Sequence, residues 1–373
     1  MTRRPRVLLL NPPGRRRYLR DVYCSHSSKG TYLYHPMDLL AQSAILDAHA
    51  ELAFVDAIAE SLSPAEVRER IDRFDPETIV FLSGAVSHQE DLAFLEPIRR
   101  ERDVALVGMG DVFLWDAEAF LERFPWIDAA LKDFVSPALA ERLDTGERPC
   151  GVLGLDPFDP SAPKRFRFGA PRYDLLALDA YRMPFGRPER FASILTSFGC
   201  PYKCSYCNTA GMRYRLRDLD GVYAELDRLT ELGIGKAYVR DPTFALNKAY
   251  THELLDALIA RGTPLSWNCF TRADLVDAEL LAKMKRAGCY LVMYGVETAS
   301  DALQEASGKG ITAAQIRRGV KLTHEAGIRT LGTYRGELYV GTAQCFFASD
   351  FTVTGAEVWH RIPGCEPSPI GCG

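Results

Sequence analysis

The stretch that decides the fold is Phe191-Ala-Ser-Ile-Leu-Thr-Ser-Phe-Gly-Cys200-Pro-Tyr-Lys-Cys204-Ser-Tyr-Cys207. Its first seven residues are typical of a buried β-strand, and the three cysteines lie in the short loop that follows. In a barrel of alternating strands and helices, the loops after the strands meet at the C-terminal mouth and build the active site. We therefore expect all three thiols at the mouth of a barrel.

The chemistry of these cysteines points to a metal cluster. Ten cysteines in a chain of 373 residues indicate metal or redox chemistry before a disulfide framework. Three thiolates on one loop suit a 4Fe–4S cluster, because three ligands leave one iron open to a Lewis-basic ligand. A structural zinc site or ordinary core thiols are the alternatives, but zinc favours paired cysteines and no second suitable pair follows. The predicted metal ligands are Cys200, Cys204 and Cys207.

The second half of the chain repeats strand and helix after this loop. Strands are predicted at 236–240, 265–270, 290–296 and 330–334, and helices at 219–232, 249–260, 278–287 and 313–326. Repeated βα units predict a parallel barrel, but a closed barrel of this kind needs at least one more unit after the fifth strand. We therefore predict a partial barrel over residues 191–334.

The first half also alternates, and the length of the chain favours two domains. Strands are predicted at 6–11, 51–55, 78–83 and 104–108, and helices at 37–48, 64–74, 88–101 and 117–124. This order predicts an α/β fold with a doubly wound, Rossmann-like sheet over residues 1–145. Residues 146–190 are rich in Pro, Gly and Asp and are predicted to be a connector.

Residues 335–373 form an atypical tail. They are Gly-rich, show almost no helical amphipathicity and contain Cys345, Cys365 and Cys372. The spacing of these cysteines matches no compact cluster motif, so a flexible, disordered or truncated tail is favoured over an auxiliary cluster.

Composition limits the classes of partner. A formal net charge of -4 argues against a protein that coats nucleic acid, since such proteins carry a basic excess. No run of about 18 apolar residues and no signal-peptide core occur, so neither a membrane span nor secretion is predicted. We expect a cytoplasmic protein.

The cysteine loop and its flanking strands resemble the radical S-adenosylmethionine (SAM) superfamily, whose hallmark is the CxxxCxxC loop. The likeness extends from about Phe191 to Leu331. It implies that SAM chelates the open iron and is cleaved reductively to a 5'-deoxyadenosyl radical. A reductant such as flavodoxin or ferredoxin, and a small-molecule substrate, are implied as partners.

The resemblance also implies four contacts to SAM. Tyr206 sits at the position that contacts adenine, and Asp241 follows the second barrel strand. Arg272 and Glu297 sit at the ends of the third and fourth strands. Each has a structural alternative: Tyr206 packs on the rim, and Asp241 caps a turn. Arg272 instead pairs with Asp274, and Glu297 is a solvated acid.

A doubly wound domain ahead of such a barrel resembles the cobalamin-binding radical SAM proteins of the class B methyltransferase type. The phrases Leu9-Leu-Asn-Pro-Pro13, Tyr34-His-Pro36 and Val55-Asp-Ala57 fit that group. Ligands of open α/β sheets lie beyond the C-terminal strand ends. The candidate cobalamin contacts are therefore Asn11, Asp56, Ser83, Gly108 and Gly110. The two glycines allow backbone to approach a flat ligand, or form a plain tight turn.

The chain departs from this group at one point. Cobalamin domains that supply a histidine to the cobalt carry DxHxxG after the first strand, and residues 11–18 contain no histidine. His49 lies in a partial imitation of that motif before the second strand, where it is interpreted as a helix-end residue. Any bound cobalamin would thus lack an axial histidine from that motif.

Together the two resemblances imply cobalamin-dependent methylation of an unactivated carbon. A cobalamin-independent radical SAM enzyme that catalyses cyclisation or rearrangement is one alternative. A truncated, non-catalytic protein that binds a cluster or cobalamin is another, because Gly332-Thr-Tyr-Arg-Gly-Glu337 replaces the Gly-Leu-Pro-Gly-Glu-Thr-like segment usual in the family.

Overall fold

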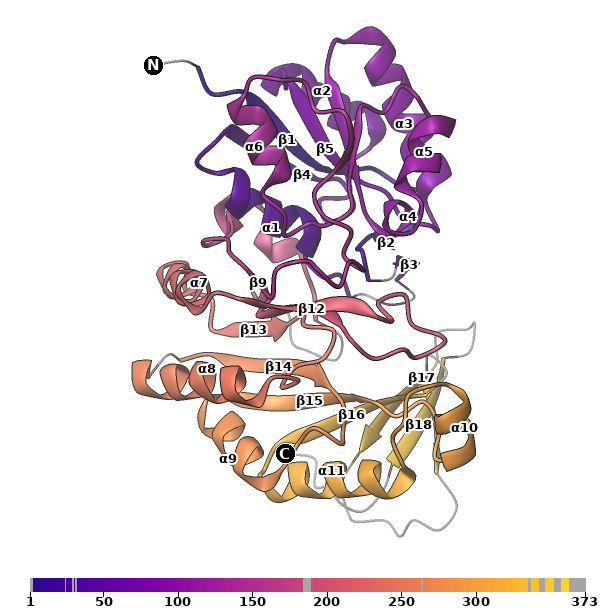
Figure 1. The fold of residues 1–373 in the computed structure, drawn as a ribbon, viewed down its shortest axis with the longest axis vertical. Coiled ribbons are helices and arrows are strands. Elements are labelled where there is room, and N and C mark those ends of the chain that lie inside the picture. Colours follow the sequence, from indigo (N-terminus) through magenta and orange to yellow (C-terminus); the bar gives the residue numbers. More distant parts are fainter. Residues whose placement is uncertain are drawn as a thin grey trace. The chain divides into compact units, whose positions relative to one another are not determined.

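The computed structural model of the chain describes residues 3–23, 25–28, 30, 32–183, 189–262, 264–334, 337–341, 346–351 and 357–361. It consists of two compact units (Figure 1). The N-terminal unit comprises residues 1–193 and 212–234, and the barrel unit comprises residues 194–211 and 235–373. Each unit is described by itself.

A six-stranded parallel sheet forms the centre of the N-terminal unit. Its order is β4-β1-β5-β6-β7-β8. The strands are β1 (Arg6–Asn11), β4 (Glu51–Asp56), β5 (Thr78–Leu82), β6 (Ala105–Met109), β7 (Ala129–Leu131) and β8 (Gly151–Leu153). In chain order this is the flavodoxin-like doubly wound arrangement, and the strand order reverses between β1 and β5. The predicted α/β fold is confirmed.

Helices cover this sheet on both faces (Figure 1). They are α1 (Met37–Leu46), α2 (Pro64–Phe74), α3 (His88–Glu101), α4 (Asp111–Leu114), α5 (Ala117–Arg123) and α6 (Ala138–Asp144). The start of α2 shows how the sequence determines where a helix begins. Ser63 accepts a hydrogen bond from the backbone of Glu66, whose carboxylate accepts one from the backbone of Ser63. This capping box satisfies amide groups that the first turn leaves unpaired.

Part of the predicted connector belongs to regular structure. Residues 151–153 form β8, and β9 (Arg165–Phe166) and two 3-10 turns, η1 (Tyr173–Leu175) and η2 (Leu178–Ala180), follow. β12 (Met212–Arg217) pairs with β9 in parallel, and α7 (Leu219–Glu231) comes after it. Residues 212–234 therefore fold within the N-terminal unit although they follow the cysteine loop in the sequence. The functional domain limits expected at residues 145, 190 and 334 stay a prediction.

The barrel unit has a parallel sheet of β13, β14, β15 and β16. Its parallel strands are β13 (Lys236–Val239), β14 (Ser266–Thr271), β15 (Cys289–Gly295) and β16 (Arg329–Tyr334). The single strand expected at 191–197 is wrong in one respect, since it breaks into β10 (Ala192–Ile194) and β11 (Ser197–Cys200). The end of β10 lies beside β13, because the backbone of Arg240 donates to the Ile194 carbonyl at 2.7 Å.

The βα repeat of the barrel unit includes α8 (Lys248–Arg261), α9 (Ala278–Arg286), α10 (Asp301–Ala306) and α11 (Ala313–Glu325). After β16, the described residues form β17 (Glu337–Gly341), β18 (Phe346–Phe351) and β19 (Glu357–Arg361), which pair antiparallel. The partial barrel is thus extended by a meander. Cys345, Cys365 and Cys372 lie outside the described residues.

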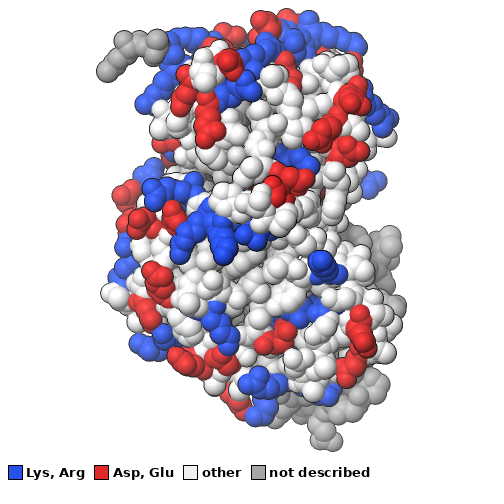
Figure 2. Space-filling model, in the orientation of Figure 1, with Lys and Arg blue, Asp and Glu red and all other residues white. Residues whose placement is uncertain are grey.

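Positive and negative side chains are interspersed over much of the face drawn in Figure 2. The exposed ion pairs of the chain include Arg73 with Glu69, one helical turn away at 2.7 Å. Within the part of the chain that the structure describes, no helix is long and apolar enough to span a membrane.

Candidate functional site

The three cysteines lie on a loop that closes on itself. Cys200 ends β11, and the backbone of Cys207 donates to the Cys204 carbonyl at 3.1 Å. The backbone of Gly211 returns to the Tyr202 carbonyl at 2.8 Å. All three cysteines carry free thiols. One short loop therefore presents three potential thiolate ligands, as the sequence predicts.

Two hydroxyl groups contact the sulfurs. Thr243 Oγ1 lies 3.6 Å from Cys200 Sγ, and Thr209 Oγ1 lies 3.2 Å from Cys207 Sγ. Burial raises the pKa of the Cys200 thiol, the hydrogen bond to Thr243 opposes this, and the charges of Cys207 and Cys204 raise it further. The three sulfurs thus share one electrostatic environment. Free, mutually interacting thiols are a donor set that fits an iron–sulfur cluster.

A single metal ion makes a different demand on its ligands. A structural zinc ion needs four ligand atoms about 2.0–2.3 Å from one point. Among the described residues, no three Cys, His, Asp or Glu side chains are gathered in this way. In a cluster, by contrast, each thiolate binds its own iron, so the sulfurs stand further apart.

Asp241 braces the strand that leads to the first cysteine. Its side chain is buried and accepts hydrogen bonds from Thr196 N at 2.7 Å, Thr196 Oγ1 at 2.5 Å and Ser197 Oγ at 2.7 Å. Burial raises the pKa of Asp241, and these hydrogen bonds oppose the shift. The carboxylate therefore spans the break between β10 and β11. The sequence had predicted either a contact to SAM or the cap of a turn for this residue, and not this role.

Arg272 pairs with Asp274, as the structural alternative predicted. Its Nε and Nη2 atoms lie 3.0 and 2.9 Å from the two Asp274 carboxylate oxygens. Its Nη1 donates to the Lys309 carbonyl at 2.9 Å. The guanidinium also lies over the ring of Tyr202, 3.8 Å from the centroid. Arg272 is thus directed at the cysteine loop.

Glu297 is paired rather than solvated. Lys309 Nζ lies 3.3 Å from Glu297 Oε1 and donates to the Gly295 carbonyl. Only 7% of the Lys309 side chain is exposed, so the cation is held at the end of β15. Glu297 has φ of 59°, a left-handed conformation that is uncommon outside glycine. The acid predicted for the SAM site is fixed by a buried lysine.

Tyr206 differs from these residues because 51% of it is exposed. Burial of the rest of the ring and the nearby charges of Glu297 and Cys204 raise its pKa, which keeps the phenol neutral. The rest of the residue is covered, so both the adenine contact and the alternative of packing on the rim stay predictions. An exposed aromatic ring beside the thiols offers a stacking surface for a flat group.

Three residues of this site escaped prediction from the sequence: Tyr202, Thr243 and Lys309. Tyr202 and Thr243 stand inside motifs that had been singled out for their neighbours. Lys309 stands between Gly308 and Gly310 at the end of α10, and this pair of glycines is the one signal that marks the turn.

The candidate cobalamin contacts lie at the strand ends of the N-terminal unit. Asn11 Nδ2 donates to Asp56 Oδ1 at 2.8 Å, and the Tyr181 hydroxyl donates to Asp56 Oδ2 at 2.8 Å. Arg20 Nη1 donates to Asn11 Oδ1, also at 2.8 Å. Burial raises the pKa of Asp56, with the backbone amide of Ala59 the strongest opposing influence. These polar groups bind one another.

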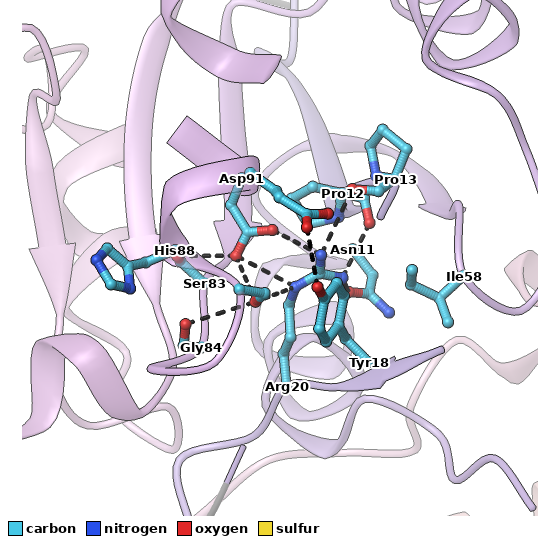
Figure 3. A network of polar contacts seen from close by, with 12 residues as sticks. Asn11, Pro12, Pro13, Tyr18, Arg20, Ile58, Ser83, Gly84, His88 and Asp91 are labelled. Atoms are coloured by element: carbon cyan, nitrogen blue, oxygen red, sulfur yellow. Dashed lines mark hydrogen bonds and ion pairs between the residues drawn. The ribbon is translucent and has the colours of Figure 1, made fainter. Parts of the chain in front are cut away.

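The third predicted polar contact, Ser83, joins the same network (Figure 3). Its hydroxyl donates to Asp91 Oδ2 at 3.0 Å, and the Ser87 hydroxyl donates to the same oxygen at 2.8 Å. Asp91 Oδ1 forms an ion pair with Arg20 Nη2 at 2.6 Å, with both side chains fully buried. Burial raises the pKa of Asp91, and the charge of Arg20 opposes it. The network closes the ends of β1, β4 and β5.

The two predicted glycine contacts have packing roles. A Cβ on Gly108 would lie 2.1 Å from the ring of Phe113. Gly110 has φ of 112°, and a Cβ there would lie 2.2 Å from the Ser83 carbonyl oxygen. The structure therefore requires glycine at both positions to let other parts of the chain approach.

Exposed apolar side chains instead mark the C-terminal edge of this sheet. They are Val86 at 49% exposure, Trp115 at 59% and Leu155 at 42%, and they follow β5, β6 and β8. Trp115 stacks on Phe158, with ring centroids 4.7 Å apart. These side chains follow strands at the edge where open α/β sheets bind their ligands. The sequence alone did not reveal them.

Comparison with known proteins gives a family to the part of the chain that carries the cysteine loop. Residues 194–336 match the Radical SAM superfamily. The chain contains a radical SAM domain. The predicted resemblance is confirmed, and such a domain implies a 4Fe–4S cluster and SAM as cofactors.

Relatives of this radical SAM protein extend the match beyond the domain. An uncharacterised methyltransferase of Pyrococcus horikoshii is 28% identical over 321 residues, which cover 80% of this chain and 68% of the relative. An anaerobic magnesium-protoporphyrin IX monomethyl ester cyclase of Cereibacter sphaeroides is 32% identical over 309 residues, which cover 76% of this chain. The chain spans only 50% of that cyclase.

The fold around the radical SAM domain is also shared. The methyltransferase TsrM of Kitasatospora setae, solved with cobalamin and a 4Fe–4S cluster, aligns with a TM-score of 0.65 and 22% identity. The alignment covers 89% of this chain and 69% of TsrM. The doubly wound sheet and the partial barrel therefore occur together in a known protein.

Proposed function

We propose that this chain is a radical SAM enzyme that uses cobalamin to methylate an unactivated carbon of a small molecule. The observation that carries the proposal is the loop with three free, interacting thiols at Cys200, Cys204 and Cys207, placed within the radical SAM domain. A doubly wound sheet with an apolar ligand edge in the same chain supports the second cofactor.

In the barrel unit, the three thiolates hold the cluster. When bound there, a 4Fe–4S cluster would supply an open iron for SAM and the electron for cleavage of its carbon–sulfur bond. Tyr206 offers its exposed ring to the adenine. Asp241 fixes the strand that precedes Cys200, since its three hydrogen bonds all run to Thr196 and Ser197.

In the N-terminal unit, a buried hydrogen-bonded network lies at the strand ends and consists of Arg20, Asn11, Asp56 and Asp91. Because these side chains bind one another, they are not available to bind a corrin. The flat ring would therefore lie on the exposed side chains of Trp115, Val86 and Leu155. Residues 11–18 contain no histidine, so this loop supplies no imidazole to the cobalt. The likeness of fold to TsrM, which was solved with cobalamin bound, supports cobalamin as a second cofactor.

The first test is anaerobic reconstitution with iron and sulfide, followed by SAM and a strong reductant. Formation of 5'-deoxyadenosine or S-adenosylhomocysteine, with a SAM-dependent change in the electron paramagnetic resonance spectrum of the cluster, is expected. If neither product forms and the spectrum does not respond to SAM, the catalytic proposal is wrong.

Cobalamin needs its own test. The reconstituted chain is incubated with hydroxocobalamin, passed through a desalting column and examined by absorbance for retained corrinoid. About one corrinoid per chain is expected for the methyltransferase. SAM cleavage without retained corrinoid would instead favour the cobalamin-independent alternative, cyclisation or rearrangement. Of these two reactions, the similarity to the Cereibacter sphaeroides cyclase supports cyclisation.

A further inference from the structure

The cysteine loop is held from one side by the turn between α10 and α11, residues 307–310. The backbone of Ser205 donates to the Ser307 carbonyl at 2.9 Å. Gly308 has φ of 71°, and a Cβ there would lie 2.8 Å from the Lys203 carbonyl oxygen. The two backbones therefore touch within the stretch that separates Cys200 from Cys207.

Arg272 joins this turn to the loop through its side chain. One face of its guanidinium lies on the Tyr202 ring, while Nη1 donates to the Lys309 carbonyl. The remaining nitrogens, Nε and Nη2, bind Asp274 in a two-pronged pair. Only 8% of the Arg272 side chain is exposed. Each nitrogen of the guanidinium thus has a protein partner.

We propose that Arg272 and Tyr202 form a positioning pair that keeps the cysteine loop closed on its cluster, and that Arg272 makes no contact with SAM. This inference rests on the proposed function, because it concerns the cluster that the three cysteines hold. It replaces the role in SAM binding that the family resemblance implies for Arg272.

The physical basis is the planarity of the guanidinium. A two-pronged pair with a carboxylate fixes the plane of an arginine, and a fixed plane gives an aromatic ring a defined surface on which to stack. Lysine keeps the charge but loses both features. A loop that carries three ligands releases iron when it opens locally, so contacts that oppose local opening should slow the loss of the cluster.

The test compares the rates at which an excess of EDTA removes iron from the reconstituted, SAM-free protein under anaerobic conditions. The variants are Tyr202→Leu and Arg272→Lys, with Tyr202→Phe and Tyr202→Trp as matched variants that keep an aromatic ring. We expect iron to leave about tenfold faster from Tyr202→Leu and Arg272→Lys, in keeping with the strength of a partly buried cation–π contact. The aromatic variants should stay within about twofold of the unmodified rate.

Two further measurements separate positioning from SAM binding. The Kd for SAM, expressed per bound cluster, should change by less than about threefold in Arg272→Lys. The double variant Tyr202→Leu/Arg272→Lys should lose iron no faster than the faster single variant, because the two residues share one contact. Tyr202 is only partly buried, so its variants are expected to fold, which circular dichroism checks.

Unchanged rates of iron loss in Tyr202→Leu and Arg272→Lys would overturn the inference while leaving the proposed function intact. A tenfold weaker Kd for SAM in Arg272→Lys with an unchanged rate of iron loss would restore Arg272 to the SAM site and also overturn it. Failure of the unmodified protein to take up any iron would overturn the proposed function itself.

Discussion

The strand ends of the two units use polar side chains in opposite ways. In the N-terminal unit, Arg20, Asn11, Asp56 and Asp91 satisfy one another and are closed to solvent. In the barrel unit, polar side chains of the same burial, such as Asp241, are satisfied by the cysteine strand and its loop. The Cys200 and Cys207 thiols there have hydroxyl groups as weak partners.

This difference separates supporting groups from reactive ones. Burying a polar group costs free energy unless the group is hydrogen-bonded. Polar groups whose hydrogen bonds are made within the fold therefore support the structure. Groups that the fold leaves unsatisfied or exposed are available to a ligand. Among the described residues, such groups include the three thiols and Tyr206 in the barrel unit and the apolar side chains at the sheet edge in the N-terminal unit.

The largest effect is expected from removing a thiol. Cys204→Ala should reduce the iron content from about four per chain to less than about one and abolish SAM cleavage, because two thiolates do not hold the cluster. Iron analysis and product assays measure this. Cys150→Ala is the matched control, since Cys150 is an exposed free thiol outside the loop. A full cluster in Cys204→Ala would contradict the assignment.

Breaking the closed network should have the next largest effect, and it should fall on stability. Arg20→Met leaves the Asp91 carboxylate buried without its cation and should reduce the free energy of unfolding by about 3–5 kcal/mol. Urea unfolding followed by circular dichroism measures it. In the exposed pair of Arg68 and Glu101, 2.8 Å apart, Arg68→Met should cost only about 0–1 kcal/mol. Equal losses in the two variants would show that the network is not a structural brace.

A smaller effect tests whether Gly108 serves packing. Gly108→Ala would push a methyl group into the ring of Phe113 and should cost about 1–3 kcal/mol of stability. Gly169→Ala is the control, because a Cβ there meets no atom within 4 Å. Thermal unfolding of the protein without cofactors compares them. If Gly108→Ala is as stable as its control, the predicted ligand role for this glycine regains support.

The smallest effect on stability is expected at the apolar edge. Trp115→Ala removes a stack on Phe158 and should cost no more than about 1.5 kcal/mol. Retention of corrinoid on the desalting column should nevertheless fall. Leu303→Ala is a matched control, since Leu303 is 55% exposed and belongs to α10. Full retention of corrinoid by Trp115→Ala would contradict the proposal that the corrin binds at this edge of the sheet.

Much of the fold was predictable because its signals are local. The period of apolar residues placed the strands and helices of both units, since burial on one face requires that period. The spacing of Cys200, Cys204 and Cys207 predicted a cluster loop because this signal is local too: three ligands at most seven residues apart must lie close together. The break in the strand between Ile194 and Ser197 escaped prediction. The partner of Thr196 at this break is Asp241, 45 residues away, and a local pattern does not reveal such a partner.

The sequence by itself therefore determined the order of elements, the cysteine loop and the family it resembles. Tertiary structure alone decided which polar residues are available to a ligand. Arg20 and Asp91 are 71 residues apart, and the sequence around one of them does not predict that the other is its partner. Whether a side chain is satisfied depends on the partners that the fold brings to it, and such partners are set by packing between distant segments rather than by local pattern.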